Sequence, residues 1–350
     1  RDDAGGEGEV GRISVRGKEA WLFEQFESSL SDSDRKLLMG GAQVSDGDGN
    51  APGQKHGGFD HAAFFSQLPP TRSPHDLGGV LLHAPKLPST QTLLFKELQC
   101  EQDGIVCVAD QQVSGRGRGG NTWASPEGCL TFSFSTSVQQ AALLPFFQYV
   151  VSMALYKTVT AFVKSDAKAA VGLQLKWPND IYGPNMAKIG GVLCESRVKV
   201  TGREQGAPPN FYVIAGVGIN LFNSQPTTCL RDMLIESGNE EAAGRLSRES
   251  FLAKFCGEFE VLLDVLRQQG FAPLSKSYTS MWMHTGQSVQ VQDEHGGPGS
   301  ARAATIRGVA PSGFLMAEDD VGAVLELHPD GNSLDMLQGL ISRKLPGISR

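Results

Sequence analysis

The sequence has no excess of positive charge. Its 350 residues include 31 Lys and Arg against 38 Asp and Glu, which gives a formal net charge of −7. Proteins that bind nucleic acid along a surface are usually basic, because they have to neutralise phosphates. We therefore predict a protein that binds no nucleic acid, in which any clustered arginines belong to a local site.

Long apolar runs and paired cysteines are missing as well. No apolar run is long enough to cross a bilayer, so no membrane partner is predicted. The six cysteines are scattered without a Cys-x-x-Cys pair, which favours neither a zinc site nor a disulfide framework and fits a reducing compartment. The chain begins at Arg1, so we expect a fragment or a processed form. The cytosol, the plastid and the mitochondrion all stay open as locations.

The first part of the chain is rich in Gly, Asp and Ser. We predict that residues 1–74 are mostly disordered or linker, with one amphipathic helical stretch over 19–30 and a flexible patch over 46–50. The proline-rich segment 68–74 is typical of a linker.

Residues 75–284 have the pattern of a globular α+β domain. Strand periodicity recurs in six segments, 80–83, 104–110, 129–135, 173–182, 189–198 and 211–221. Long helical spacing covers 144–164 and 247–269, and a shorter helix is expected over 273–283. These elements predict a mixed β-sheet backed by the two long helices.

The sequence pattern changes again in the last part of the chain. Short strands alternate with Gly- or Asp-rich turns, at 289–291, 303–309, 313–317 and 323–327. We predict that residues 285–350 form a small β-barrel-like domain, too small to carry much chemistry alone.

The most informative segment is the glycine-rich loop Ser114-Gly-Arg-Gly-Arg-Gly-Gly-Asn121. Its four glycines let the backbone turn N–H groups toward one point, and Arg116 and Arg118 add fixed positive charge, so the loop can hold an anion. A dinucleotide-binding pattern is excluded, because no helix begins after the loop and the acidic residue expected about twenty positions on is missing. The Gly-x-x-x-x-Gly-Lys-Ser/Thr phosphate loop is absent. An Arg-Gly-Gly segment can also mark RNA binding, and a plain connecting loop stays open.

Three further blocks follow the loop at informative spacing. They are Lys176-Trp177-Pro178-Asn179-Asp180, Lys188-Ile189-Gly190-Gly191 and Gly216-Val217-Gly218-Ile219-Asn220. Together with Gln112 and the loop, they resemble the signature blocks of the biotin protein ligases, in that order and at similar spacing. The segments Pro226-Thr-Thr-Cys-Leu230 and Leu327-His-Pro-Asp-Gly-Asn-Ser333 are similar to those of the plant-type holocarboxylase synthetases. The resemblance covers about residues 75–345.

The resemblance implies a fold and a reaction. The fold is a class II synthetase-like catalytic domain followed by an SH3-like β-barrel. Such enzymes use ATP, biotin and Mg²⁺: they join the biotin carboxylate to the α-phosphate of ATP, release pyrophosphate, and pass biotin to a lysine of a carboxylase carrier domain. Bacterial relatives that repress transcription have an N-terminal winged helix, but residues 1–74 show no helix-turn-helix pattern of sufficient length, so we expect an enzyme without DNA binding. A lipoate or octanoate ligase of the same fold is the alternative activity, and a non-catalytic RNA-binding protein is the alternative class.

Three cations are the predicted catalytic residues: Arg118, Lys176 and Lys188. The first step of the implied reaction brings a carboxylate against a polyanion, so fixed cations and aimed N–H groups have to overcome repulsion. A guanidinium suits this task because its planar fork binds phosphate or carboxylate at two points. The resemblance directs Lys176 to the phosphates and Lys188 to the biotin carboxyl, although most lysines are solvated surface charges. The glycine loop is expected to close over the intermediate and keep water away.

The other site residues also come from the resemblance. Those expected at biotin are Ser89, Thr90, Gln91, Gln112, Arg116, Gly117, Gly190, Gly216 and Gly218. Those expected at the nucleotide are Arg116, Arg118, Trp123, Lys176, Asn179 and Asn220. Asp180 is expected to hold the metal ion through water.

Several of these residues have a purely structural alternative. Ser89-Thr90 is also typical of a helix N-cap, and Gln91 stands where the family most often has Asn, which leaves that contact open. Trp123 is expected either to stack on adenine or to anchor the core. Asn179-Asp180 after a proline is ordinary turn chemistry, and a glycine pair within a strand is also typical of a bulge.

Overall fold

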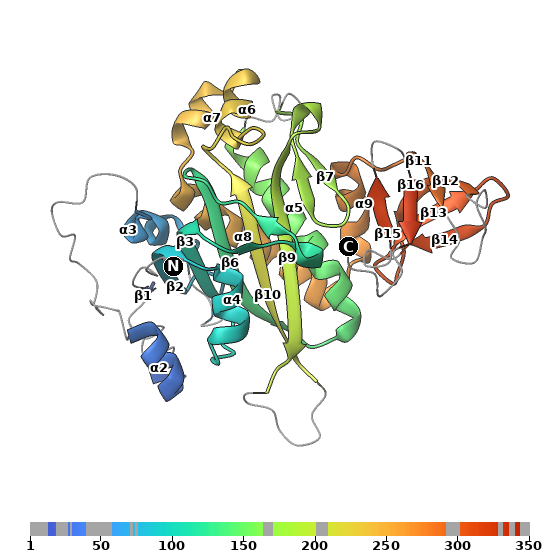
Figure 1. Ribbon diagram of the computed structural model, residues 1–350. Helices are drawn as coiled ribbons and strands as arrows, with labels where there is room; N and C mark the ends of the chain where they lie inside the picture. The colour runs from blue at the N-terminus through green and yellow to red at the C-terminus, as the bar shows by residue number, and fades with distance from the viewer. Residues whose placement is uncertain are drawn as a thin grey trace, which may run out of the picture.

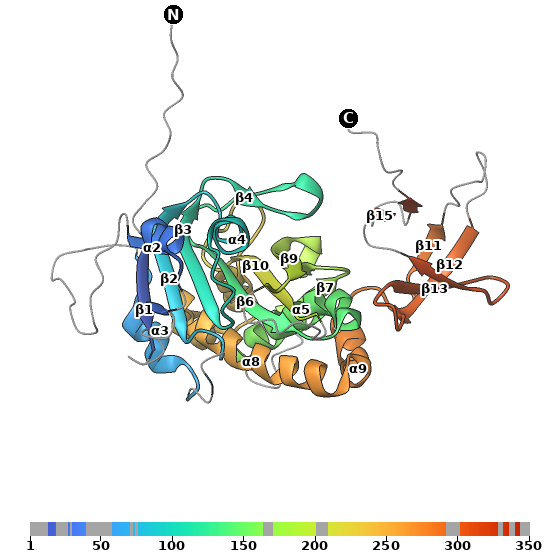
Figure 2. The ribbon, with the colours of Figure 1, turned by 90° about the horizontal axis from the view of Figure 1, so that it is seen from below.

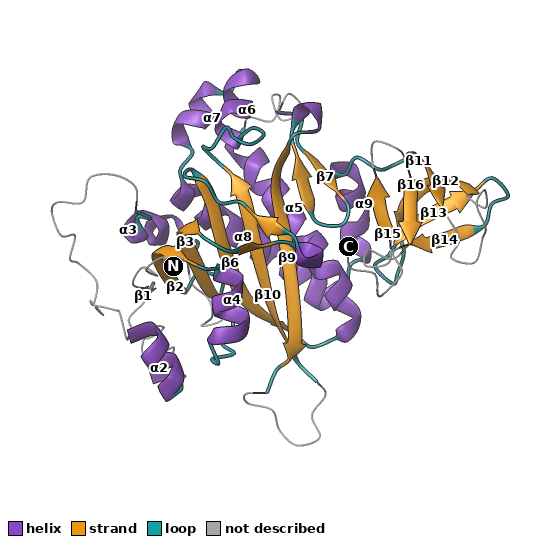
Figure 3. Cartoon of the chain, viewed as in Figure 1, coloured by secondary structure: helices purple, strands orange, loops and turns teal. Residues whose placement is uncertain are grey.

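An eight-stranded mixed sheet forms the centre of the protein (Figures 1 and 3). The computed structural model describes residues 13–18, 27–28, 30–39, 58–70, 73, 76–163, 171–200, 209–291, 302–327, 332–335 and 340–343. The strands lie in the order β1-β2-β3-β6-β10-β9-β8-β7, and β2 and β3 run parallel while the other neighbours run antiparallel. Their bounds are Ser14–Gly17 (β1), Val80–Leu87 (β2), Ile105–Gln112 (β3), Cys129–Val138 (β6), Gln174–Lys176 (β7), Asp180–Tyr182 (β8), Lys188–Val198 (β9) and Phe211–Asn220 (β10).

Two long helices, α5 (Leu144–Phe162) and α8 (Arg248–Gln269), cover one face of this sheet (Figure 2). Alternate residues of β10, from Val213 to Ile219, belong to the same buried apolar cluster as the aromatic side chains of the two helices. Because successive side chains of a strand point to opposite faces, Gly216, Gly218 and Asn220 are left for the other face. The mixed sheet backed by helices is therefore confirmed, and its alternation decides which face is available for a site.

The other face carries short elements. They are helix α4 (Thr90–Thr92), which continues into a π-helical turn over Leu93–Glu97, and the hairpin of β4 (Gly115–Arg116) and β5 (Thr122–Trp123). Figure 2 shows them on the side of the sheet away from α8. A second, smaller apolar cluster lies under α4 and includes Tyr212 and Ile214 of β10. Apolar packing thus fills only part of this face.

The C-terminal region forms a separate six-stranded sheet in the order β14-β13-β12-β11-β16-β15. The bounds are Ser288–Val291 (β11), Arg302–Val309 (β12), Leu315–Asp319 (β13), Val324–Leu327 (β14), Asn332–Asp335 (β15) and Leu340–Arg343 (β16). The sheet follows helix α9 (Ala272–Met281) and lies beside it in Figure 1. Its buried side chains, such as Ile306 and Leu315, join the apolar cluster of α5 and α8. A small β unit is therefore present, and its classification as an SH3-like barrel stays a prediction, as do the domain boundaries at 74/75 and 284/285.

The N-terminal region contributes one strand and two helices to the described residues. β1 pairs antiparallel with β2 and extends the sheet at its edge. Helix α3 (His61–Gln67) packs against α8. Helix α2 (Asp32–Met39) lies earlier in the chain, two residues after Leu30. The predicted helix over 19–30 lies mostly outside the described residues, and the predicted flexible patch over 46–50 lies wholly outside them.

Most strands and helices predicted within residues 75–284 are confirmed, with two differences. The single strand expected over 173–182 is wrong: the chain turns at Trp177-Pro178-Asn179, so that β7 and β8 form a hairpin. Two short helices, α6 (Leu230–Glu236) and α7 (Glu240–Arg245), were not predicted.

One described helical stretch, Ala141–Phe162, is long and apolar enough to cross a membrane by length and composition alone. No such segment was expected, because the unbroken apolar runs of the sequence are short. Of its most apolar window, 67% is buried inside the protein. This helix therefore packs in the core, with its apolar side chains against the sheet and α8.

Candidate active site

The candidate site lies on the sheet face opposite α5 and α8. One row of residues crosses four neighbouring strands there: Lys176 pairs with Asp180, Asp180 with Gly191, and Gly191 with Gly218. Directly paired residues present their side chains on the same face. Three of the four signature blocks thus meet in one row, although they lie far apart in the sequence.

Lys188 and Asp180 form an ion pair within this region. The Nζ of Lys188 lies 2.8 Å from Oδ1 of Asp180, and both side chains are about one-third exposed or less. A Cβ at position 191 would lie 3.3 Å from the same Oδ1, so Gly191 leaves room for the carboxylate. The carboxylate therefore holds the ammonium group in place at the surface of the sheet.

Lys176 lies at the end of β7, and its Nζ is 5.6 Å from the centre of the Tyr182 ring. The backbone pairing with Asp180 brings it to the same hairpin as Asp180. The structure thus brings two of the three predicted catalytic cations, Lys176 and Lys188, to strands on either side of Asp180, and Lys188 forms the ion pair with its carboxylate.

The third predicted cation, Arg118, comes from the glycine-rich loop. Its Nη1 donates a 3.2 Å hydrogen bond to Oδ1 of Asn179, and Nδ2 of Asn179 donates to the carbonyl of Val192 at 2.7 Å. The turn after β7 is thereby tied to the loop above it and to β9 below it. Gly119 and Gly120 have φ values of 62° and 81°, which glycine adopts without strain.

Trp123 follows the loop and packs directly on the sheet. A Cβ at position 218 would lie 2.3 Å from Cε2 of the indole, so only glycine admits the ring at that point. The Nζ of Lys188 is 5.7 Å from the centre of the ring. The half-buried Trp123 therefore lies among the site residues, and its predicted stacking on adenine stays a prediction.

Asn220 ends β10 and is buried. Its Nδ2 donates to the carbonyl of Thr228 at 3.2 Å and to Oγ1 of Thr227 at 3.4 Å, and Thr227 donates to the carbonyl of Lys188 at 2.6 Å. Asn220 thus fixes the segment that follows β10 against the start of β9. Its predicted nucleotide contact is not tested by these bonds.

The predicted biotin residues of α4 form a hydrogen-bonded group with the half-buried Gln112. The backbone N–H of Thr90 donates to Oε1 of Gln112 at 2.8 Å, and the Oγ1 of Thr90 lies 2.8 Å from Oγ of Ser133. Ser89 is the N-cap residue of α4 and accepts from the N–H of Thr92 at 3.3 Å. The N-cap alternative for Ser89 is confirmed, and Thr90 and Gln112 are placed side by side.

Gln91 lies at the base of this group. It is 3% exposed, and a Cβ at position 216 would come within 2.7 Å of its Oε1. Gly216 therefore makes room for the amide rather than forming a bulge, since β10 keeps an unbroken register with β6 and β9. Gly190 differs: it pairs with the core residues Ile181 and Ile219, so it lies on the face toward α5 and α8, and a Cβ there would be 3.1 Å from the carbonyl oxygen of Gly218.

Arg116 and Glu195 form a two-point ion pair that the sequence analysis missed. Nη1 and Nη2 of Arg116 donate to the two carboxylate oxygens of Glu195 at 2.8 and 2.9 Å. Ser133 is also a member of the site that sequence reasoning missed. A charged residue within the apolar pattern of β9 and serines alternating with phenylalanines in β6 were the available signals.

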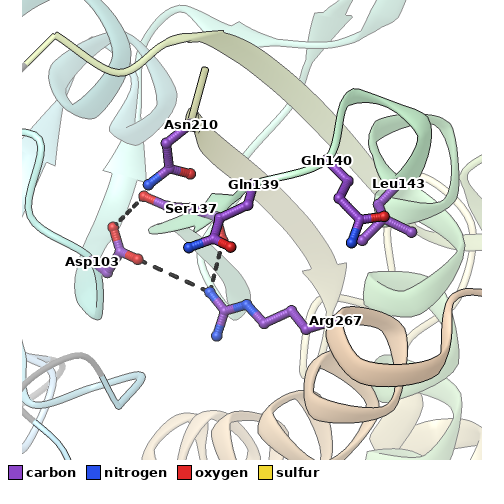
Figure 4. Close-up of a pocket in the computed structure, with 7 residues that line it drawn as sticks. All are labelled: Asp103, Ser137, Gln139, Gln140, Leu143, Asn210 and Arg267. Carbon is purple, nitrogen blue, oxygen red and sulfur yellow. Dashed lines mark hydrogen bonds and ion pairs between the residues drawn. The ribbon is translucent and has the colours of Figure 1, made fainter. Parts of the chain in front are cut away.

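A separate polar cavity of about 340 Å³ lies at the opposite end of the sheet, near the end of β6 and the start of β10 (Figure 4). Figure 4 shows Asp103 and Arg267 on either side of it. Arg267 donates to the carbonyl of Ser137 at 2.7 Å, and Asp103 accepts from the hydroxyl of Ser137 at 2.6 Å. The cavity contains none of the predicted site residues.

Comparisons with known proteins point to one family. A family model described as the biotin/lipoate A/B protein ligase family matches residues 84–207. Biotin–protein ligase 2 of Arabidopsis thaliana is 38% identical over 287 residues, which are 82% of this chain and 83% of the relative. The human biotin–protein ligase is 34% identical over 77% of this chain, which spans 36% of the human protein.

A solved structure with the same fold is the biotin protein ligase of Aquifex aeolicus in complex with biotin and ATP. It superimposes with a TM-score of 0.53 at 23% identity, over 71% of this chain and 94% of that chain. At this level of identity the superposition supports the fold alone.

Proposed function

The chain belongs to the biotin–protein ligase family, and we propose that it attaches biotin to carboxylase carrier domains in two steps, at the site described above. In the first step, a carboxylate oxygen of biotin attacks the α-phosphorus of ATP, the bond to the β-phosphate breaks, and pyrophosphate leaves. In the second, the amine of a carrier lysine attacks the acyl carbon of biotinyl-AMP, loses a proton and displaces AMP. An amide bond to biotin results.

The observation that carries this proposal is the grouping of cations on one sheet face under a glycine-rich loop. Lys176 and Lys188 come from strands next to Asp180, and Arg118 is tied to the adjacent turn through Asn179. The first step forces two anions together, so its main barrier is their repulsion. Cations held in place by neighbouring groups lower that barrier without having to reorganise.

We assign roles to the cations on this basis. Lys188 would hold the biotin carboxylate, exchanging its bond to Asp180 for one to the ligand, and Lys176 and Arg118 would face the phosphates. Trp123 and Asn220 would contact the nucleotide, Thr90 and Gln112 the ureido ring. The glycine-rich loop would cover the mixed anhydride and keep water from it.

For Mg²⁺ the fit with the described residues is limited. They contain no cluster of three or more His, Cys, Asp or Glu side chains that could hold a metal ion. Mg²⁺ keeps several water ligands and usually binds through substrate phosphates and one or two carboxylates. Asp180 offers a single carboxylate, so it would act on Mg²⁺ through water.

The proposal includes the finer features of the fold and the setting. The catalytic domain would be class II synthetase-like and the C-terminal sheet SH3-like. A location in the cytosol or an organelle is proposed, and one relative from Arabidopsis thaliana is named as chloroplastic. Nucleic acid and membranes are not among the proposed partners.

The test is ATP–pyrophosphate exchange by the purified chain with biotin or lipoate. We expect exchange with biotin, and its loss in Lys188→Ala. Lys254→Ala, which changes an exposed lysine of α8 on the opposite face, is the matched control and should exchange normally. Exchange only with lipoate would establish the alternative ligase activity, and tight RNA retention without exchange would favour the RNA-binding alternative.

A further inference from the structure

Glu195 connects the glycine-rich loop to the buried polar group around Gln91. Its two carboxylate oxygens accept from Arg116, and Oε2 also accepts from Nε2 of Gln91 at 3.0 Å. The Glu195 side chain is 22% exposed and that of Arg116 is 32% exposed. A two-point bond between charged groups at this level of burial is among the stronger hydrogen-bonded contacts in proteins.

The carboxylate, together with the carbonyl of Ile214, decides which way the Gln91 amide faces. An ionised carboxylate only accepts hydrogen bonds, so Gln91 has to present its NH₂ group to Glu195. The same NH₂ group donates to the carbonyl of Ile214 at 3.3 Å. The amide oxygen of Gln91 is therefore directed to Ser133, whose hydroxyl donates to it at 3.2 Å.

The direction of hydrogen bonding at Ser133 also affects Thr90, one of the predicted biotin residues. Because the Ser133 hydroxyl donates its proton to Gln91, it can only accept from Thr90, whose hydroxyl lies 2.8 Å from Oγ of Ser133 and 3.2 Å from Oε1 of Gln112. Oε1 of Gln112 accepts from the backbone N–H of Thr90, and Nε2 of Gln112 points to Oγ of Ser125 at 3.3 Å. The charge of Glu195 thus helps to set the direction of Gln91 and, through Ser133, of the hydroxyl groups next to it, whereas the backbone N–H of Thr90 sets the direction of Gln112.

The geometry points to Glu195 as a positioning residue for biotin binding: it anchors the glycine-rich loop through Arg116 and sets the donor and acceptor pattern of the ureido-binding group through Gln91. This inference rests on the proposed function. The guanidinium of Arg116 is consequently bound to Glu195, so Arg116 contributes to the binding of biotin and ATP through the position of its backbone rather than through its charge. This differs from the phosphate or biotin contact that the sequence predicted for the Arg116 side chain.

The first experiment compares Glu195→Gln with Glu101→Gln. Glu101 is the control, because it accepts from Arg197, which lies on the same strand as Glu195, at 3.1 Å, and its side chain is 4% exposed. We expect Glu195→Gln to raise the KM for biotin in the exchange assay about tenfold or more, since charged hydrogen bonds are lost, with less than a twofold change in the KM for ATP. The control should leave both values within twofold. A biotin KM within twofold of wild type in Glu195→Gln overturns the inference.

A second readout does not depend on enzyme activity. Trypsin cuts after Arg116 and Arg118, so the rate of cleavage in the folded protein reports how firmly the loop is held. Glu195→Gln should be cut faster there than wild type and than Glu101→Gln, and equal rates would overturn the anchoring role. If the wild type lacks biotin-dependent exchange, the proposed function fails, whereas the cleavage result still decides the anchoring role.

Two further variants separate the two roles. Ser133→Ala breaks the path between Gln91 and Thr90 without touching Arg116, so it should raise the biotin KM and leave the cleavage rate unchanged. The exchange Arg116→Glu with Glu195→Arg restores the ion pair but places a donor against the NH₂ group of Gln91. It should restore slow cleavage after Arg118, the trypsin site that this variant keeps, and not the biotin KM, and full recovery of the KM would overturn the role of Glu195 in directing the hydrogen bonds.

Discussion

The indole Nε1 of Trp177 donates a 2.8 Å hydrogen bond to the hydroxyl of Tyr149. The same hydroxyl donates to the carbonyl of Gly313 at 2.5 Å. Trp177 belongs to the turn between β7 and β8, and Gly313 lies in the turn between β12 and β13 of the C-terminal sheet. A buried tyrosine of α5 thus joins the candidate active site to the C-terminal region.

Tyr149→Phe should weaken this connection. The variant leaves the Nε1 of Trp177 and the carbonyl of Gly313 without their shared partner, which costs about 1–3 kcal/mol for buried groups. We expect a lower thermal midpoint and a reduced exchange rate with biotin. Tyr156→Phe, which changes a half-buried tyrosine of the same helix, is the control, and equal midpoints for the two variants would contradict the prediction.

A second prediction concerns His284, which also contacts this turn. Its Nε2 accepts from the backbone N–H of Trp177 at 2.9 Å and its Nδ1 lies 2.8 Å from Oε1 of Gln287, so the ring is neutral with the proton on Nδ1. Burial lowers the pKa of His284 below its ordinary value of 6.5, and Lys176 lowers this pKa further. As the pH falls below 6.5, the unfolded chain therefore takes up a proton before the folded chain does, and stability decreases.

His284→Gln tests this pH dependence. A glutamine oxygen can accept from Trp177 but does not titrate, so we expect its thermal midpoint to fall less between pH 7.5 and pH 5 than that of the wild type. His284→Ala should be less stable than both at pH 7.5. Parallel curves of midpoint against pH for wild type and His284→Gln would show that His284 is not responsible.

Gly218→Ala should disturb the site without touching a charged group. The added Cβ would lie 2.3 Å from Cε2 and 2.4 Å from Nε1 of Trp123, so the indole has to move. Because small misplacements of site groups can cost about a hundredfold in rate, we expect a loss of at least tenfold in kcat/KM for ATP. Gly244→Ala in α7, where a Cβ meets nothing within 4 Å, should keep full activity; a loss in both variants would point to a general effect of added bulk.

Arg118→Gly should release the reactive intermediate. The variant removes a cation and the bond from Arg118 to Asn179 that ties the loop to the turn. We expect biotin to appear on bystander proteins, detected by streptavidin blotting, and biotinyl-AMP to accumulate in solution. Arg118→Lys, which keeps the charge but not the planar fork, should leak less. Unchanged selectivity in Arg118→Gly would argue against a covering role for the loop.

The sequence was sufficient for the elements whose pattern is local. The strands β6, β9 and β10 and the helices α5 and α8 alternate or repeat over many residues, and their predicted positions are confirmed to within a few residues. The row of glycines and lysines was also foreseeable, since those residues stand in recognisable blocks.

The rest depends on contacts between distant segments. β1 is four residues long and becomes a strand because β2 offers it an edge. The pair of Arg116 and Glu195 joins residues 79 positions apart, and nothing in the local pattern of β9 says which cation its carboxylate meets. The sequence predicted one strand where β7 and β8 form a hairpin, because a proline within an apolar run does not by itself indicate that the chain turns back there.

The pairing of β1 with β2 has a practical consequence for anyone shortening this chain. β1 covers the outer backbone groups of β2 along four residue pairs, Ser14 to Gly17. Preparations that start beyond this strand would expose a row of amide and carbonyl groups on an apolar strand, which is a template for association with another copy. Self-association of such a shortened protein would then come from the exposed edge of β2, and not from a change in the candidate active site.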